Sequence, residues 1–205
     1  MGSNPIPATM ISVVMASYLG DYKKAAKDRD KKIIRAVNSV LKQTIPVELV
    51  VVSDGCQKTI DIISKNFPGQ VNGYWIEKQK IWSGRPRNVG IERAKNDIIC
   101  YCDVDDYLDF DHCEKIYNAF TGDWVWFDDL IYNQGHWVQR KCDVAKRGMC
   151  GTSNVAHKKI AYWPDPGSYA HDYIFIHNLK QASKKYKYIG KGGYRTCHIP
   201  GRYDV

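Results

Sequence analysis

The first half of the chain alternates short apolar runs with segments of helical periodicity, and this alternation constrains the fold more than any other feature. The apolar, β-branched runs lie at residues 10–16, 47–52, 71–77 and 98–102. Between them, apolar side chains recur at helical spacing in residues 31–43, 59–67 and 86–95. Such runs are typical of strands buried on both faces of a parallel sheet. The sequence therefore predicts an α/β fold: a doubly wound, mostly parallel central sheet with helices on both faces, whose ligands bind beyond the carboxyl ends of the strands.

The pattern becomes less regular after about residue 120. Two longer strands are expected at 124–132 and 136–143, joined as an antiparallel hairpin through Asn133-Gln134-Gly135. A last helix is expected at 172–184. Two short strands are expected at 186–189 and 194–199, separated by the glycine-rich stretch 190–193. We therefore expect a smaller, antiparallel C-terminal part.

The chain reads as one folding unit. With 44% hydrophobic and 25% charged residues, and no internal repeat or linker, it is predicted to form a single domain over residues 10–205, with halves 10–120 and 121–205. Residues 1–9 precede a second methionine, Met10, and are expected to be a leader or an expression remnant. No run of about 18 apolar residues and no signal peptide is found, which predicts a cytoplasmic protein without a transmembrane segment.

The cysteines and the charges give two further expectations. Seven cysteines occur without a C-x-x-C pair or zinc-type spacing, so we expect reduced, mostly buried thiols. Residues 138–205 hold 13 Lys and Arg against 4 Asp and Glu, whereas the rest of the chain is nearly neutral. This basic third is suited to peripheral contact with an acidic surface or with nucleic acid. It fits equally well the solvated side of a helix and the following strand.

Three carboxylates, Asp103, Asp105 and Asp106, lie within four residues directly after an apolar run. Their mutual repulsion is unfavourable unless a cation compensates it. Oxygen ligands of this kind suit Mn²⁺ or Mg²⁺, which bridge protein carboxylates to substrate phosphates. An exposed acidic turn is the alternative, since Asp109 and Asp111 also precede a helical segment and are typical of helix caps.

The order of several segments resembles the family 2 glycosyltransferases with the GT-A fold. The segments are ISVVMASY, NSVLKQT, ELVVVSDGC, GRPRNVGIERAKNDIICYCDVDDYLDFDH and AHDYIFI, and they span residues 10–180 in the family's order. The longest of them contains a glycine, an Arg-Asn-x-Gly motif, an apolar strand and a D-x-D-D loop in uninterrupted sequence. The resemblance implies an inverting enzyme that moves a sugar from a nucleoside diphosphate sugar, such as a UDP-sugar, to an acceptor hydroxyl. The two halves would then bind the nucleotide-sugar and the acceptor, respectively.

The resemblance also assigns roles at the donor end. The residues after the first strand would hold the nucleoside, with Tyr18 placed to stack on the base. An aspartate would bind the pyrimidine, although Ser53 stands here where many relatives have another aspartate. Arginines would approach the diphosphate, because a guanidinium suits phosphate oxygens. The residues concerned are Ala16, Ser17, Tyr18, Asp54, Arg85 and Arg87. For Tyr18 and Asp54, the alternatives are a packing residue and a turn aspartate.

In the acidic loop, the resemblance makes Asp105 the principal metal ligand, puts Asp103 near the ribose and metal, and leaves Asp106 in support. Asp172 looks like the general base of the family's Glu-Asp motif, with His171 in place of the glutamate. Its alternative is a helix cap. His198 follows the closing strand, where some relatives place a metal-binding histidine, although a lone histidine is more often structural.

The acceptor cannot be read from the sequence, and a glycan, a lipid-linked glycan, a protein or a nucleic acid all stay open. The segment 149–172 should bind it, and Trp163 and Tyr169 there suit either stacking on a ligand or the core. The stretch 190–194 suits a flap over the donor or a surface turn. Two other function classes are a sugar-1-phosphate nucleotidyltransferase and a non-catalytic nucleotide or nucleic-acid binding module. The first is disfavoured because the stretch after the first strand has one glycine rather than a glycine-rich phosphate loop.

Overall fold

The computed structural model describes residues 9–79 and 83–205, so the predicted leader lies, apart from Thr9, outside the described residues. The helices are α1 (Arg29–Leu41), α2 (Gln57–Asn66), α3 (Gly84–Arg93), α4 (His112–Ala119), α5 (His171–Ala182) and the 3-10 turn η1 (Thr152–Asn154). The strands are β1 (Ile11–Ser17), β2 (Val47–Asp54), β3 (Asn72–Ile76), β4 (Ile98–Tyr101), β5 (Tyr107–Leu108), β6 (Trp124–Asn133), β7 (His136–Arg140), β8 (Val155–Lys158), β9 (Tyr186–Thr196), β10 (His198–Ile199) and β11 (Tyr203–Asp204).

One nine-stranded sheet organises the chain, in the order β3-β2-β1-β4-β8-β6-β9-β5, with β7 paired to β6. The strands β3, β2, β1 and β4 are parallel, whereas β8 is antiparallel to both β4 and β6. A separate antiparallel pair, β10 and β11, lies near the C-terminus. The predicted α/β sheet, mostly parallel in its first half and antiparallel toward the C-terminus, is confirmed.

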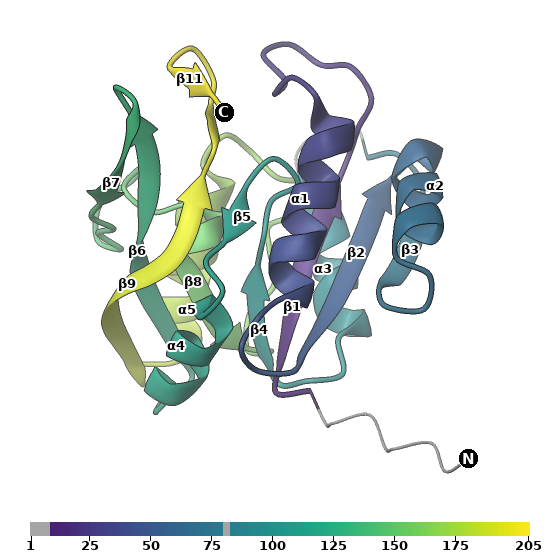
Figure 1. Cartoon of the computed structure of the whole chain (residues 1–205). Helices are drawn as coiled ribbons and strands as arrows, with labels where there is room; N and C mark the ends of the chain where they lie inside the picture. The colour runs from purple at the N-terminus through teal and green to yellow at the C-terminus, as the bar shows by residue number, and fades with distance from the viewer. Residues whose placement is uncertain (1–8, 80–82) are drawn as a thin grey trace.

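The helices cover the sheet on both faces, which explains the apolar runs in the strands. Along β1, Val13 and Met15 pack with α1 and α2, while Val14 packs with α3. The face of α1, α2 and α4 is turned toward the viewer in Figure 1, with α3 and α5 behind the sheet. A strand between two helical layers has no solvent side, so its sequence shows no polar alternation. The carboxyl ends of β1, β2 and β4 are thereby brought to one edge of the sheet.

The glycine-rich stretch is a part of β9, and the prediction of a turn or flap at residues 190–194 is wrong. The strand runs without a break from Tyr186 to Thr196 beside β6, with register shifts near Asp128. Gly192 lies against the ring of Phe127, and a Cβ built on it would come within 2.2 Å of that ring. Glycine is present here because two elements approach closely inside a strand.

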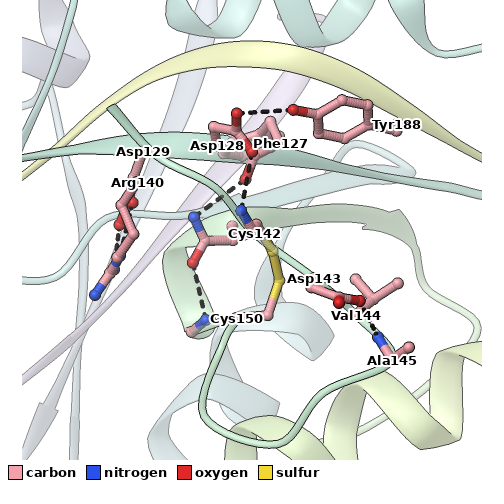
Figure 2. Close-up of a disulfide and its surroundings, with 12 residues drawn as sticks. Phe127, Asp128, Asp129, Arg140, Cys142, Asp143, Val144, Ala145, Cys150 and Tyr188 are labelled. Carbon is pink, nitrogen blue, oxygen red and sulfur yellow. Dashed lines mark hydrogen bonds and ion pairs between the residues drawn. A yellow bond between two sulfur atoms is a disulfide. The ribbon is translucent and has the colours of Figure 1, made fainter. Parts of the chain in front are cut away.

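A disulfide joins Cys142 to Cys150 and closes the loop that follows β7 (Figure 2). The prediction that all cysteines are reduced is therefore wrong for this pair, while the other five are buried free thiols. Sequence spacing could not show the pairing, because the loop's course depends on a distant carboxylate. Asp128 of β6 accepts hydrogen bonds from the Cys142 backbone N (2.9 Å) and the Tyr188 hydroxyl (2.7 Å), which tie the start of the loop to β6. Among residues 9–79 and 83–205, no helix has the length and apolar character that crossing a bilayer requires.

Candidate functional site

A cavity of about 600 Å³ lies at the carboxyl ends of β1, β2 and β4. Most of the predicted donor and metal residues line it: Ala16, Tyr18, Asp54, Arg87, Asp103 and Asp105. Its other described lining residues are Asp21, Tyr22, Lys78, Ser83 and Val104. Ligands of doubly wound sheets bind at this edge.

Helix α3 delivers Arg87 to the cavity, and its first residue explains the glycine of the motif. A Cβ built on Gly84 would come within 2.2 Å of the Pro164 carbonyl oxygen, so no larger residue fits between the helix and the segment before α5. Asn88 fastens the same segment: its Nδ2 donates to the carbonyl of Trp163 (3.0 Å), and its Oδ1 accepts from the Trp163 N (2.8 Å). Gly84 and Asn88 of the motif thus fix the segment before α5 against helix α3, in addition to the placement of Arg87 at the cavity.

The Arg87 guanidinium is buried to 5% exposure yet faces the cavity. It donates to the Ser83 hydroxyl and, through Nη2, to Asp103 Oδ1 at 3.1 Å. Because a guanidinium has five N–H donors, these two bonds leave donors for a further ligand. A phosphate group is the anion that such a planar donor set suits best.

The acidic loop holds its three carboxylates in different surroundings. Burial, and next the charge of Asp103, raise the pKa of Asp105 to about 6. Burial also raises the pKa of Asp106 well above its usual value, and this carboxylate accepts hydrogen bonds from the Tyr194 hydroxyl (2.8 Å) and the Cys197 N (2.6 Å). Asp106 therefore fastens the loop to β9, while Asp103 and Asp105 stay directed at the cavity.

The donor set fits a hard divalent cation. Among the described residues, no group of three or more His, Cys, Asp or Glu has metal-binding geometry. Mg²⁺ and Mn²⁺ need no such cage, since one or two carboxylates together with substrate phosphates and water can complete their coordination. Asp103 and Asp105 offer two carboxylates, and the raised pKa of Asp105 indicates a position where negative charge lacks compensation. These two residues would hold the ion.

The lining of the cavity also includes an aromatic ring beside an ion pair. Lys78 Nζ lies 2.6 Å from Asp54 Oδ2 and 4.2 Å from the centroid of the Tyr18 ring. The Gln79 N donates to the other Asp54 oxygen at 2.7 Å. Sequence reasoning missed Lys78. The feature that could have identified it is its position directly after the third expected strand. Sequence reasoning also missed Tyr22, whose pKa is raised by burial and then by Asp105.

Three predicted residues are placed differently. Ser17 is buried, and its hydroxyl lies 2.8 Å from Thr59 Oγ1, because alternation along β1 turns its side chain away from Ala16. Arg85 is exposed and, within the part of the chain that the structure describes, does not line the cavity. His198 lies beside the loop rather than in the lining, with Nε2 3.0 Å from the Lys24 carbonyl and Nδ1 3.4 Å from Asp204 Oδ1. Its charge is nevertheless among the causes that lower the pKa of Asp105.

Asp172 is the second residue of α5, and its environment differs from that of a helix cap. The helix is preceded by Ala170 as its N-cap, with no side-chain capping bond among the described residues. Asp172 Oδ1 instead accepts a hydrogen bond from the Thr152 hydroxyl (2.7 Å) and lies 3.3 Å from His171 Nε2. Of the two aromatics in the preceding segment, Trp163 is buried in the core while Tyr169 is 84% exposed.

Comparison with protein families and curated proteins gives one family. The model of Glycosyl transferase family 2 matches residues 25–159. The putative glycosyltransferase EpsH of Bacillus subtilis (strain 168) is 28% identical over 94 residues, which cover 45% of this chain and 27% of that protein.

Solved structures share the fold. TarS 1-349 of S. aureus in complex with UDP-GlcNAc superposes with a TM-score of 0.71 at 19% identity, covering 95% of this chain and 60% of that chain. The mannosyltransferase PcManGT from Pyrobaculum calidifontis, in complex with GDP-Man and Mn²⁺, gives a TM-score of 0.63 at 12% identity, covering 98% and 60%. The chain thus spans less than two thirds of each of these proteins. At such identities the structural likeness concerns the fold alone.

Proposed function

The chain belongs to glycosyl transferase family 2, and on that premise we propose that it moves a sugar from a UDP-sugar to an acceptor hydroxyl with inversion. The observation that carries the proposal is the lining of the cavity, which combines an aromatic ring, Asp54 and Lys78 with Arg87 and two carboxylates. A nucleoside and a metal-bound diphosphate need these two kinds of environment. The donors to test first are UDP-GlcNAc, which is bound in the TarS complex, and GDP-Man, which is bound with Mn²⁺ in the PcManGT complex.

The residues of the chain would divide the work between donor and acceptor. Tyr18 would pack against the base and Asp54 would accept a hydrogen bond from a ring N–H, with the Lys78 ammonium moving from the ring face to a base carbonyl. Arg87 would donate to the diphosphate oxygens. When bound by Asp103 and Asp105, Mn²⁺ or Mg²⁺ would supply positive charge against the leaving group. His198 lies near enough to Asp105 to change its pKa and is proposed as a further ligand.

Asp172 is proposed as the general base. It would accept the proton of the acceptor hydroxyl while that oxygen forms the new bond to the anomeric carbon and the bond to the diphosphate breaks. A single displacement of this kind inverts the anomeric centre. The bond from Thr152 to one oxygen supports the role, because it fixes the carboxylate while the second oxygen remains able to take a proton.

A donor screen tests the proposal without knowledge of the acceptor. The chain is incubated with UDP- and GDP-sugars and Mn²⁺, and slow hydrolysis is followed as nucleoside diphosphate release. We expect release from one donor class, lost in EDTA and in Asp105→Asn, a nearly isosteric change in a loop. The matched control is Asp21→Asn, a carboxylate of the same cavity outside the acidic loop.

The alternatives give different results in the same screen. A non-catalytic module would bind a donor but release no diphosphate during any incubation. A nucleotidyltransferase would also release no nucleoside diphosphate in the screen, but would release pyrophosphate in a separate incubation with a nucleoside triphosphate and a sugar 1-phosphate. Either outcome would contradict the proposal.

A further inference from the structure

Trp163 lies in the irregular segment between β8 and α5, yet its side chain is only 2% exposed. Its ring stacks on Phe175 of α5, with centroids 3.9 Å apart and an angle of 14° between the planes. Arg87 Cζ lies 4.8 Å from the centroid of the same ring. Because the phenyl group covers one face of the indole, the guanidinium takes the other face. One ring therefore joins the arginine of the cavity to the helix that carries Asp172.

The indole is held on several sides and cannot adjust its position easily. The side chain of Asn88 brackets its backbone with two hydrogen bonds, of 2.8 and 3.0 Å. The indole Nε1 donates to the Tyr101 hydroxyl at 2.9 Å, and that hydroxyl lies 2.6 Å from His157 Nε2. These partners are all buried, so moving the ring would leave polar atoms without partners away from water. The indole therefore gives Arg87 a rigid surface to pack against.

The fixed position of the indole matters for Arg87, which is proposed to donate to the diphosphate oxygens. The hydrogen bonds to Ser83 and Asp103 hold Nη1 and Nη2 of the guanidinium, and the indole supports it from the side of its Cζ. A guanidinium meets phosphate oxygens as a planar fork, so the orientation of its plane decides how many donors reach the ligand. A cation over a desolvated indole is also an attractive contact in itself.

We propose that Trp163 is a positioning residue: its indole orients the Arg87 guanidinium toward the diphosphate of the donor and couples it to the helix of Asp172. This inference rests on the proposed function, because it takes the cavity as the donor site. It predicts that Trp163 affects the binding of phosphates and leaves the binding of the nucleoside alone.

The test compares UDP with uridine, both measured by calorimetry in the presence of Mn²⁺; GDP and guanosine replace them where the donor screen selects guanine. Trp163→Leu removes the ring, and Trp163→Phe keeps an aromatic face without the indole N–H. Tyr101→Phe is the matched control, since it breaks the same buried hydrogen-bond chain and leaves the indole in contact with Arg87. Thermal unfolding of each variant reports the structural cost separately.

We expect Trp163→Leu to weaken UDP binding about tenfold or more, the size of one hydrogen bond between Arg87 and the charged diphosphate, while the affinity for uridine stays unchanged. Trp163→Phe should lie between this variant and the native chain, and it carries the test if Trp163→Leu does not fold. Tyr101→Phe should lower the melting temperature without changing the ratio of the two affinities. Equal losses for UDP and uridine, or an unchanged ratio in both Trp163 variants, would overturn the inference. A native chain that binds neither diphosphate would instead refute the proposed function itself.

Discussion

Asp172 combines a restrained oxygen with one that can still take a proton, and this makes its role separable from donor binding. Asp172→Asn keeps the shape of the side chain but cannot accept the acceptor's proton. We expect transfer to fall by about 10²–10⁴-fold, the usual contribution of positioned proton transfer, with diphosphate affinity unchanged. A transfer assay beside calorimetric titration measures both.

Thr152→Val is the matched control for that prediction, since it removes the hydrogen bond to Asp172 Oδ1 and keeps the carboxylate. Its effect on transfer should be smaller than that of Asp172→Asn. If Asp172→Asn lost diphosphate affinity together with activity, Asp172 would belong to the donor site. The exposed carboxylate of Asp165 would then be the next candidate for the base.

His157 is buried and neutral, and this makes the free energy of unfolding depend on pH. Burial lowers its pKa to about 4, below its ordinary value of 6.5, and its Nε2 lies 2.6 Å from the Tyr101 hydroxyl. The folded state therefore resists a proton that the unfolded chain takes up, so this contribution to stability is present above pH 6.5 and is lost as the pH falls toward 4. The loss should reach about 3 kcal/mol.

Urea unfolding between pH 7 and 4 measures this loss, with His157→Gln as the reference, because glutamine can accept the tyrosine hydroxyl and does not titrate. The difference in slope between the two proteins isolates the histidine from the carboxylates that titrate in the same range. Identical slopes would show that His157 does not carry the effect.

Where a motif and a strand end together determined the position of a residue, the sequence was informative about its location, while its role stays a prediction. Arg87, Asp103 and Asp105 line the cavity as expected, because the acidic loop leaves β4 directly at the edge of the sheet. Lys78 was not predictable in the same way. It reaches Asp54 across 24 residues, a contact that depends on the pairing of β2 with β3. Ser17 faces Thr59 although its neighbours face the cavity.

At the scale of elements, strands covered on both faces could be predicted to within two residues, as β1, β2 and β4 illustrate. Periodicity is informative there because burial decides every position. It was uninformative for β8, which has four residues and fits between β4 and β6 through long-range pairing alone. It was misleading for β9, where Gly192, which accommodates Phe127, belongs to a stretch with the composition of a turn.

The loop after β7 is held by its disulfide together with hydrogen bonds to Asp128 and Lys180 and the packing of Val144 in the hydrophobic core. Lys180 Nζ donates to the Val144 carbonyl at 2.8 Å. Replacing Cys142 and Cys150 by serine should lower the free energy of unfolding by about 2–3 kcal/mol, the chain-entropy value for a closed loop of this length. Chemical denaturation of both proteins measures the difference.

A reducing agent supplies the control for the disulfide. It should lower the stability of the native chain by a similar amount and leave the double serine variant unchanged. Diphosphate affinity should be equal in all samples, since neither cysteine lines the cavity of the described residues. A native chain that is equally stable with and without the reductant would contradict the prediction.

Positive and negative charges lie in different parts of the molecule, and this distribution favours cation binding at the cavity. Most of its excess positive charge lies in residues 138–205, whereas the cavity collects Asp21, Asp54, Asp103 and Asp105 against Lys78 and Arg87. The site is thus acidic within a basic chain. A diphosphate that approaches it meets like charge unless a cation is present. The suitability of the basic third for an acidic surface stays a prediction.

This balance leads to a prediction for the folded state as a whole. UDP or a UDP-sugar should raise the melting temperature only when Mn²⁺ or Mg²⁺ is present, because the cation offsets repulsion between the carboxylates and the diphosphate. At a ligand concentration 100 times Kd, the stabilisation should be about 2.7 kcal/mol, which corresponds to about 5–10 °C for a chain of this size. Asp105→Asn should abolish the metal-dependent part of the shift, whereas Asp21→Asn should retain it. Because burial raises the pKa of Asp105 to about 6, a proton competes with the cation below that pH, and the shift should shrink as the pH falls from 7 to 5. Equal stabilisation in EDTA would mean that the diphosphate is held by Arg87 and Lys78 without a metal bridge.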